Sequence, residues 1–280
     1  MLRFFYEQSN VVKGQKKNLA LKNRVPAQAV LQNFMLERLL ERISISQYKD
    51  KFILKGGMLI ASLIGINNRT TMDMDATLRN YPLSKETIRE AFLGICTIQL
   101  NDEVTLVLDH IDPIREADDY SGYRVAIIAR YESINTPLKI DITTGDSITP
   151  NAILYTFHSI FENKLIEIWA YNIETILAEK VETIMRRSVL NTRQRDYYDV
   201  YIIMNNQRRA HNKKVFKTAL KATSEKRGSL LALQNKEIIL QTIQSDAIMR
   251  QRWDRYCKEY YYAKDIEFDD VIGVLINIQN

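Results

Sequence analysis

The chain has 280 residues, of which 46% are hydrophobic and 26% charged, and its formal net charge is +5. This composition can bury a sizeable core in one large or two ordinary domains, which excludes a disordered chain. Cys96 and Cys257 are the only cysteines and lie far apart without a CxxC pattern, which excludes a disulfide framework and a zinc site. No apolar run reaches the roughly 18 to 20 residues of a membrane span, and residues 1–14 lack the apolar stretch of a signal peptide. We therefore expect a cytoplasmic protein with no membrane partner.

Residues 27–71 contain a helix pattern, a strand pattern and a second helix pattern. Residues 27–43 carry apolar side chains at three-and-four spacing and predict an amphipathic helix. The sequence KFILKGG, residues 51–57, predicts a short apolar strand ended by two glycines, and residues 58–66 predict a helix. The loop NNRTT, residues 67–71, follows this helix and leads into a further strand.

That strand, MDMDATL in residues 72–78, places two carboxylates one residue apart. Side chains alternate between the faces of a strand, so Asp73, Asp75 and Thr77 are expected on one face and the apolar residues on the other. Two like charges on one face repel each other unless a cation lies between them. The pair therefore predicts a bound divalent cation.

Three later segments rich in Val and Ile predict strands: residues 123–131, 138–145 and 164–172. The acidic stretch 102–119 is interpreted as a loop. From Ile173 onward the apolar spacing is helical, first in residues 173–190 and 194–205 and then to the end of the chain. The expected fold class is α+β, a mixed sheet domain with helices in residues 1–172 and a helical domain in residues 173–280.

Basic residues are concentrated in two parts of the chain. Residues 186–217 contain nine basic residues against two acidic ones, and residues 1–24 contain six against one. Such runs are often only the solvated faces of helices, whereas a folded patch of one sign attracts a polyanion. Charge alone therefore leaves a nucleic-acid partner open.

If the predicted strands share one sheet, a third carboxylate, Asp141, joins Asp73 and Asp75 beside the two glycines. Three carboxylates can hold two Mg²⁺ ions, which activate an attacking hydroxyl and neutralise a leaving pyrophosphate in phosphoryl transfer. The sequence therefore predicts a magnesium and nucleoside triphosphate site with these three aspartates as metal ligands. Asp141 is the predicted base for the attacking hydroxyl.

Residues around the two glycines are candidates for binding the nucleotide. Glycines at a strand-to-helix turn let a phosphate approach the backbone, where the N–H groups and dipole of the helix favour an anion. Nearby cations can bind phosphates, although they can equally be surface residues. The nucleotide-binding candidates in this region are Lys55, Gly56, Gly57, Arg69, Thr70, Thr71 and Lys139.

Lys180 falls within the apolar stripe of the predicted helix 173–190, so it needs a partner. Asp196 and Asp199 share one face of the next helix at three-residue spacing. One reading is an interhelical ion pair that only holds the helices together. The other gives Lys180 and Asp196 catalytic roles, with Lys180 on the nucleotide phosphates, Asp196 orienting it, and Asp199 at the nucleotide.

At these residues the chain resembles the DNA polymerase β-like nucleotidyltransferases and, within them, the AbiEii/AbiGii toxins of bacterial abortive-infection systems. FILKGGMLIASLIGINNRTTMDMDATL is similar to the first motif of the toxin family and LKIDITTGDSITP to its second. ILAEKVETIMRR is similar to the third motif and RQRDYYDVYII to the fourth. The resemblance covers about residues 27–206, and residues 207–280 receive no function from it.

The resemblance implies a polymerase β-like fold and a nucleotide-transferring toxin that a separately encoded antitoxin neutralises in defence against phage. Related toxins modify transfer RNA ends, so transfer of a nucleoside monophosphate to RNA, with tRNA as acceptor and the basic helices as its binding surface, is expected. One departure is the fifteen residues between Gly57 and Asp73, more than in minimal polymerase β-like enzymes.

Two alternatives remain open at the level of sequence. A nucleotidyltransferase of this kind can act on a small molecule such as an antibiotic, although the basic helices suit a polyanion better than a compact drug. A non-catalytic module that binds nucleic acid or a protein partner can keep the same fold. That module would not need its carboxylates, yet all three positions here are Asp.

Overall fold

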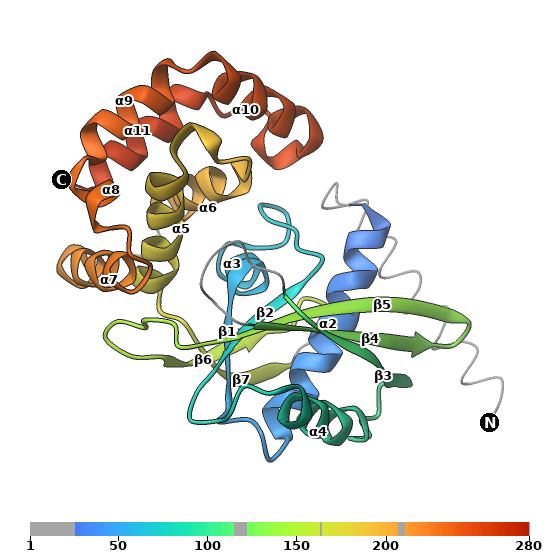
Figure 1. Cartoon of the computed structure of the whole chain (residues 1–280). Coiled ribbons are helices and arrows are strands. Elements are labelled where there is room, and N and C mark those ends of the chain that lie inside the picture. Colours follow the sequence, from blue (N-terminus) through green and yellow to red (C-terminus); the bar gives the residue numbers. More distant parts are fainter. Residues whose placement is uncertain (1–25, 115–121, 163, 207–210, 280) are drawn as a thin grey trace. The chain divides into compact units, whose positions relative to one another are not determined.

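The computed structural model describes residues 26–114, 122–162, 164–206 and 211–279 (Figure 1). The chain divides into two compact units. The first contains residues up to Gly145 together with Leu154–Ala170, and the second contains Asp146–Ile153 together with the residues from Tyr171 onward. Within the described ranges, no helix is long and apolar enough to cross a membrane.

The first unit is built on a mixed sheet of seven strands in the order β3-β4-β5-β2-β1-β7-β6 (Figure 1). Strand β2 runs parallel to β5 and antiparallel to β1, and β4 runs antiparallel to both β3 and β5. The strands are β1 (Phe52–Lys55), β2 (Met74–Leu78), β3 (Val104–Pro113), β4 (Gly122–Tyr131), β5 (Ile134–Thr144), β6 (Ile153–His158) and β7 (Leu165–Ala170).

The described residues of the same unit form three helices: α2 (Ala27–Ile45), α3 (Gly56–Ile64) and α4 (Lys85–Cys96). Phe34 of α2 packs against Tyr131 of β4, and Phe92 of α4 packs against Phe52 of β1. Both helices therefore cover the apolar face of the sheet, where alternate residues of β4 and β5 such as Ile127 and Ile140 are fully buried. The opposite face carries the polar residues of these strands.

The sequence patterns located five of the seven strands, and the acidic stretch 102–119 was interpreted wrongly as a loop. Residues 104–113 form β3, an edge strand in which Val104, Leu106 and Ile111 are buried while the residues between them are mostly exposed. Acidic side chains occupy the exposed positions and obscure the alternation, because an edge strand needs only one apolar face. Asp118 and Asp119 lie outside the described residues.

The second unit is helical, as the periodicity after Ile173 predicts. Asn172 caps α5 by accepting a hydrogen bond from the Thr175 backbone N–H at 2.8 Å. A core of aromatic rings, including Tyr197, Trp253 and Phe268, joins the later helices. The elements are α5 (Ile173–Arg187), η1 (Ser188–Leu190), α6 (Gln194–Asn205), α7 (Lys213–Lys226), α8 (Leu230–Gln234), α9 (Lys236–Ser245), α10 (Ala247–Glu259), η2 (Tyr261–Ala263) and α11 (Phe268–Gln279).

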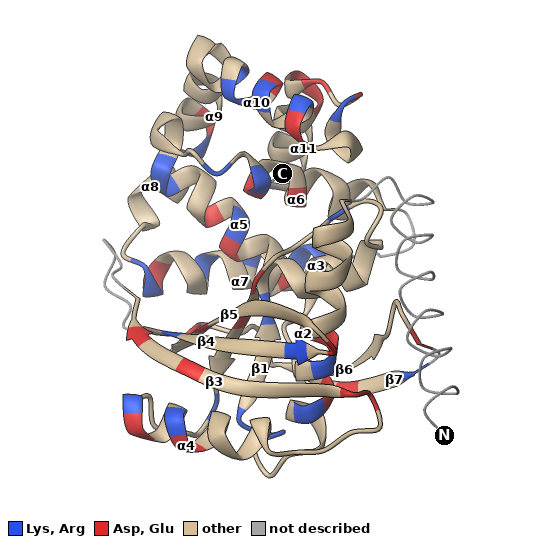
Figure 2. Cartoon of the chain, turned by 90° about the vertical axis from the view of Figure 1, so that its right-hand side faces the viewer, with Lys and Arg blue, Asp and Glu red and all other residues tan. Residues whose placement is uncertain are grey.

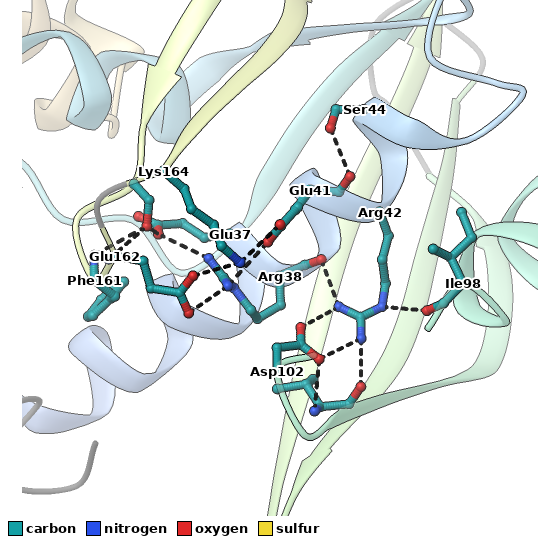
Figure 3. A network of polar contacts seen from close by, with 12 residues as sticks. Glu37, Arg38, Glu41, Arg42, Ser44, Ile98, Asp102, Phe161, Glu162 and Lys164 are labelled. Atoms are coloured by element: carbon teal, nitrogen blue, oxygen red, sulfur yellow. Dashed lines mark hydrogen bonds and ion pairs between the residues drawn. The ribbon is translucent and has the colours of Figure 1, made fainter. Parts of the chain in front are cut away.

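Helix α2 carries buried charges that attach it to two loops of the first unit (Figure 3). Arg42 makes a two-pronged ion pair with Asp102, at 2.7 and 3.0 Å, just before β3. Arg38 is fully buried and pairs with Glu162 at 2.8 Å in the connection between β6 and β7. Because buried charges are costly unless they are paired, these contacts fix where both loops meet the helix.

Glu37 of the same helix is also buried, with 1% of its surface exposed. It accepts hydrogen bonds from the Ser159 hydroxyl at 2.6 Å and from the Ile160 backbone N–H at 3.0 Å. Burial raises the pKa of the Glu37 carboxyl to about 7, and the neighbouring Glu162 charge adds to the rise while Ser159, Ile160 and Arg38 oppose it. Glu37 is therefore expected to take up a proton near neutral pH.

This shift predicts a pH-dependent stability that Glu37→Gln removes. Between pH 4.5 and 7 the folded state keeps the Glu37 proton while the unfolded state loses it, so the stability falls as pH rises through this window. The loss is expected to reach about 3 kcal/mol. Urea unfolding at pH 5 and pH 8 measures it, with Glu37→Gln as the matched variant. Equal pH dependence in the two proteins contradicts the prediction.

Candidate active site

Four charged residues form one row across the polar face of the sheet. Lys55 of β1 lies opposite Asp75 of β2, Asp75 lies opposite Asp141 of β5, and Asp141 lies opposite Arg124 of β4. Residues directly opposite on neighbouring strands point to the same face and are close enough to interact. The row therefore brings two of the predicted carboxylates side by side between two cations.

Arg124 and Asp141 are joined by two hydrogen bonds, from Nε to Oδ1 and from Nη2 to Oδ2, both at 2.7 Å. The hydrogen bond to Asp141 raises the pKa of the Arg124 guanidinium, and the charges of Asp141, Asp73 and Asp75 raise it further. All three predicted carboxylates thus act on one guanidinium. Arg124 was not among the residues predicted from the sequence, although a charged residue within a strand rich in Val and Ile could have indicated a role.

The two glycines at the start of α3 lie directly against the row. Gly56 has a φ of +67°, and a Cβ there would overlap the Asp75 carboxylate oxygen and lie 2.7 Å from Asp75 Cγ. A Cβ at Gly57 would lie 2.8 Å from the Thr71 hydroxyl and 3.1 Å from Arg69 Nη2. Only glycine lets the backbone approach the carboxylate and the loop before β2 this closely.

Lys55 and Lys139 lie on the same polar face as the carboxylates. The Lys55 Nζ donates a hydrogen bond to the Thr143 hydroxyl at 2.8 Å, which connects β1 to β5. Lys139 is exposed and precedes Asp141 by two residues on β5, so both side chains project from one face. Both lysines can therefore act on an anion near the row.

Asp73 lies before β2 rather than within it. The strand begins at Met74, and Met72 is 39% exposed, so the expected alternation is wrong at these two positions. The backbone at residues 71–73 is held by Thr71 and not by strand pairing. Thr71 is 4% exposed, and its hydroxyl donates a hydrogen bond to the Asp73 carbonyl at 3.0 Å. A loop with its own hydrogen bonds does not have to follow the strand period.

Two side-chain amides of α2 donate hydrogen bonds to the backbone of the loop that precedes β2. Asn33 donates to the Thr71 carbonyl at 3.0 Å, and Gln32 donates to the carbonyls of Met72 at 3.0 Å and of Pro137 on β5 at 2.9 Å. Arg69 is 2% exposed and donates to the Thr70 carbonyl, so it is an interior residue of the loop. Helix α2 therefore positions Asp73, although no residue of this helix was predicted to support the site.

In the second unit, Lys180 of α5 contacts both predicted aspartates of α6. Its Nζ lies 2.6 Å from Asp196 Oδ1 and 3.0 Å from Asp199 Oδ2. Asp199 is fully buried and Asp196 nearly so, while the Lys180 side chain is 19% exposed. Among the described residues no group donates a hydrogen bond to Asp196 Oδ2, which is buried. The interhelical ion pair exists, and the catalytic roles of the three residues stay predictions.

The donor set of the row fits magnesium. Among the described residues no group of three or more His, Cys, Asp or Glu side chains is arranged to hold a metal ion. Magnesium, however, is usually bound by only one or two carboxylates, with water and substrate phosphates completing its six ligands. Asp75 and Asp141 supply two neighbouring carboxylates beside the N-terminus of α3, which suits a cation that arrives with a nucleotide.

Comparisons with known proteins gave a match to one family model and to several solved structures. A family model described as nucleotidyl transferase AbiEii toxin, type IV toxin–antitoxin system, matches residues 38–274. The search of curated proteins found no match. MenT4, a nucleotidyltransferase toxin from Mycobacterium tuberculosis, is 13% identical over 91% of this chain and 94% of its own, with a TM-score of 0.54. A putative nucleotidyltransferase from Helicobacter pylori is 15% identical over 90% of this chain and 95% of its own, with a TM-score of 0.48.

The close approach at Gly56 predicts that Gly56→Ala destabilises the first unit. A residue with a side chain at positive φ costs about 1 to 2 kcal/mol, and the new Cβ also displaces the Asp75 carboxylate. Gly273→Ala is the control, because a Cβ at that α11 position meets nothing within 4 Å, and it should be neutral or stabilising by about 0.5 to 1 kcal/mol. Thermal and urea unfolding compare the variants, and equal stability of the two contradicts the close approach.

Proposed function

The chain belongs to the AbiEii family of nucleotidyl transferase toxins of type IV toxin–antitoxin systems, and from this we propose that it transfers a nucleoside monophosphate from an NTP to an RNA acceptor. The observation that carries the proposal is the facing pair Asp75 and Asp141, beside the glycine turn at the start of α3. We expect the acceptor to be tRNA, as the resemblance in sequence implies. Membership of a toxin–antitoxin family implies an antitoxin as partner, and defence against phage is the proposed setting.

Asp73, Asp75 and Asp141 would hold the magnesium ions of the reaction. When bound, these ions neutralise the triphosphate and make the acceptor hydroxyl more acidic. Asp141 would take the proton of that hydroxyl while its oxygen forms a bond to the α-phosphorus. The bond between the α-phosphorus and the pyrophosphate oxygen then breaks, and pyrophosphate leaves.

Residues around the glycine turn would bind the triphosphate. The backbone N–H groups at the start of α3, at Gly56 and Gly57, favour an anion, and Lys55 and Lys139 add positive charge on the same face. Arg69, Thr70 and Thr71 would shape the pocket from the adjoining loop. Lys180 would bind phosphate, with Asp196 and Asp199 holding its ammonium group in place.

A basic helix supports RNA as the acceptor. Helix α7, labelled in Figure 2, contains five lysines against one acidic residue, Glu225. All five lysines are exposed, whereas Phe216 and Leu220 of the same helix are buried. Clustered exposed lysines attract the phosphates of a nucleic acid and release their counterions. Arg193, just before α6, adds an exposed positive charge. Arg208 and Arg209, which belong to the basic stretch 186–217, lie outside the described residues, as do residues 1–24.

Purified protein incubated with each labelled NTP, Mg²⁺ and total RNA tests the proposal directly. Label in a tRNA-sized band is expected. Label in a small-molecule fraction would instead support transfer to a compact substrate, and no label with any NTP would support a non-catalytic binding module. Measuring RNA binding at increasing KCl concentration is a second test, because the affinity for RNA should fall steeply with salt if exposed lysines bind the phosphates.

Asp73→Asn and Asp75→Asn are each expected to abolish growth arrest and to lower RNA labelling by about 100-fold or more, because each removes a metal-ligand charge. The fold should survive, since losing one like charge relieves repulsion in the metal-free protein. The melting temperature in EDTA should hold or rise. Asp109→Asn, at an exposed position of β3, is the matched control. Growth arrest that persists in either site variant at wild-type expression contradicts the catalytic assignment.

Lys180 requires a design that separates phosphate binding from ion pairing. Lys180→Met leaves two buried carboxylates without their cation, which is expected to cost about 3 kcal/mol or more. Adding Asp196→Asn and Asp199→Asn removes the unpaired charges and should restore much of the stability. If Lys180 binds phosphate, this triple variant folds but loses about 100-fold or more of the labelling. The double aspartate variant that keeps Lys180 is its control, and full activity of the triple variant contradicts the phosphate role.

A further inference from the structure

Arg124 lies between two carboxylates on neighbouring strands. On one side its strand partner is Asp141 of β5, and on the other side it is Asp112 of β3. The guanidinium is paired with Asp141 and not with Asp112, whose side chain is 66% exposed and lies 3.6 Å from His110 Nε2. Arg124 therefore has a second carboxylate within the same row of the sheet.

The pairing occupies both oxygens of Asp141. Nε and Nη2 each donate a hydrogen bond of 2.7 Å, one to each oxygen, which is the geometry in which arginine binds a carboxylate most strongly. Each oxygen keeps a further lone pair, but the guanidinium covers one side of the carboxylate and its positive charge repels a divalent cation. Metal and Arg124 therefore compete for the same atoms.

We propose that Arg124 is the internal counter-ion of the metal site: it neutralises Asp141 before the metal nucleotide binds, and it competes with the metal for that carboxylate. This inference rests on the proposed metal-dependent transfer. Once displaced, the guanidinium can move toward Asp112 or toward the phosphates of the nucleotide, so a nucleotide helps to release it. The metal-free site is thereby protected from the repulsion of adjacent carboxylates, and free metal ions bind it weakly.

The test measures metal binding without any reaction. Isothermal titration of the EDTA-treated, dialysed full-length protein with Mn²⁺, in the absence of nucleotide, gives a Kd for each variant. Arg124→Ala is expected to bind Mn²⁺ about three- to tenfold more tightly than the wild type, because it removes a two-pronged charged pair that is partly exposed. Arg124→Gln, which keeps N–H donors but loses the charge, covers the case in which the alanine variant folds poorly.

Arg130→Ala is the matched control. Arg130 lies six residues along β4, on the same face and exposed, but its strand partners are Asn135 and Thr105 rather than carboxylates. The Arg130→Ala substitution makes the same change in net charge as Arg124→Ala and should leave the Kd for Mn²⁺ unaltered. If Arg130→Ala binds Mn²⁺ more tightly by the same factor as Arg124→Ala, the effect is one of net charge alone, and the proposal is overturned.

Two further outcomes separate this inference from the proposed function. If Asp141→Asn loses Mn²⁺ binding while Arg124→Ala and Arg124→Gln bind as the wild type does, Arg124 only ties β4 to β5, and the counter-ion role is overturned while the metal site stands. If Asp141→Asn binds Mn²⁺ as the wild type does, Asp141 is no metal ligand and the counter-ion role is overturned, while the transfer itself is judged by RNA labelling. Tighter binding in both Arg124 variants together with loss in Asp141→Asn supports both.

Discussion

The pairing of β2 with β5 places two aspartates directly opposite each other, and the candidate site depends on how the repulsion between their charges is offset. Like charges facing each other across a sheet are destabilising. Lys55 and Arg124 flank the pair, so the row as a whole is neutral. The cost of assembling the carboxylates is thus reduced without burying them, which leaves them available to a cation with a higher charge than either side chain.

Helix α2 supports the site although none of its residues belongs to it. Its buried charges attach the connections before β3 and between β6 and β7, and its two amides hold the loop that carries Asp73. Each contact is long-range in the sequence. Such contacts let a short strand and a bend keep a defined geometry with few apolar residues of their own, which is how rigid elements commonly position functional loops.

The sequence predicted much of the fold because apolar periodicity reports directly which face of an element is buried. It located α2, α5, α6 and the central strands, and it selected the facing pair Asp75 and Asp141 from their local patterns. It did not find β3, because acidic residues on the exposed face of that edge strand resemble a loop. It also assigned Asp73 to the strand, because a local pattern contains no information about the hydrogen bonds of Thr71.

The parts of the site that the sequence did not predict depend on strand register. Arg124 lies seventeen residues from Asp141 and becomes its neighbour only through the pairing of β4 with β5. Gln32 and Pro137 are 105 residues apart and meet in the same way. A single sequence shows which residue types are available, whereas the register decides which of them meet.

Gln32 contacts two backbone carbonyls from different parts of the site, and both of its hydrogen bonds come from one amide nitrogen. The side chain therefore fixes the spacing between the lead into β2 and β5. Spontaneous deamidation would convert this amide to a carboxylate, which has no hydrogen to donate and would face two carbonyl oxygens in a buried place. Chemical ageing at Gln32 would thus release the loop that carries Asp73 from β5 without altering any of the predicted site residues.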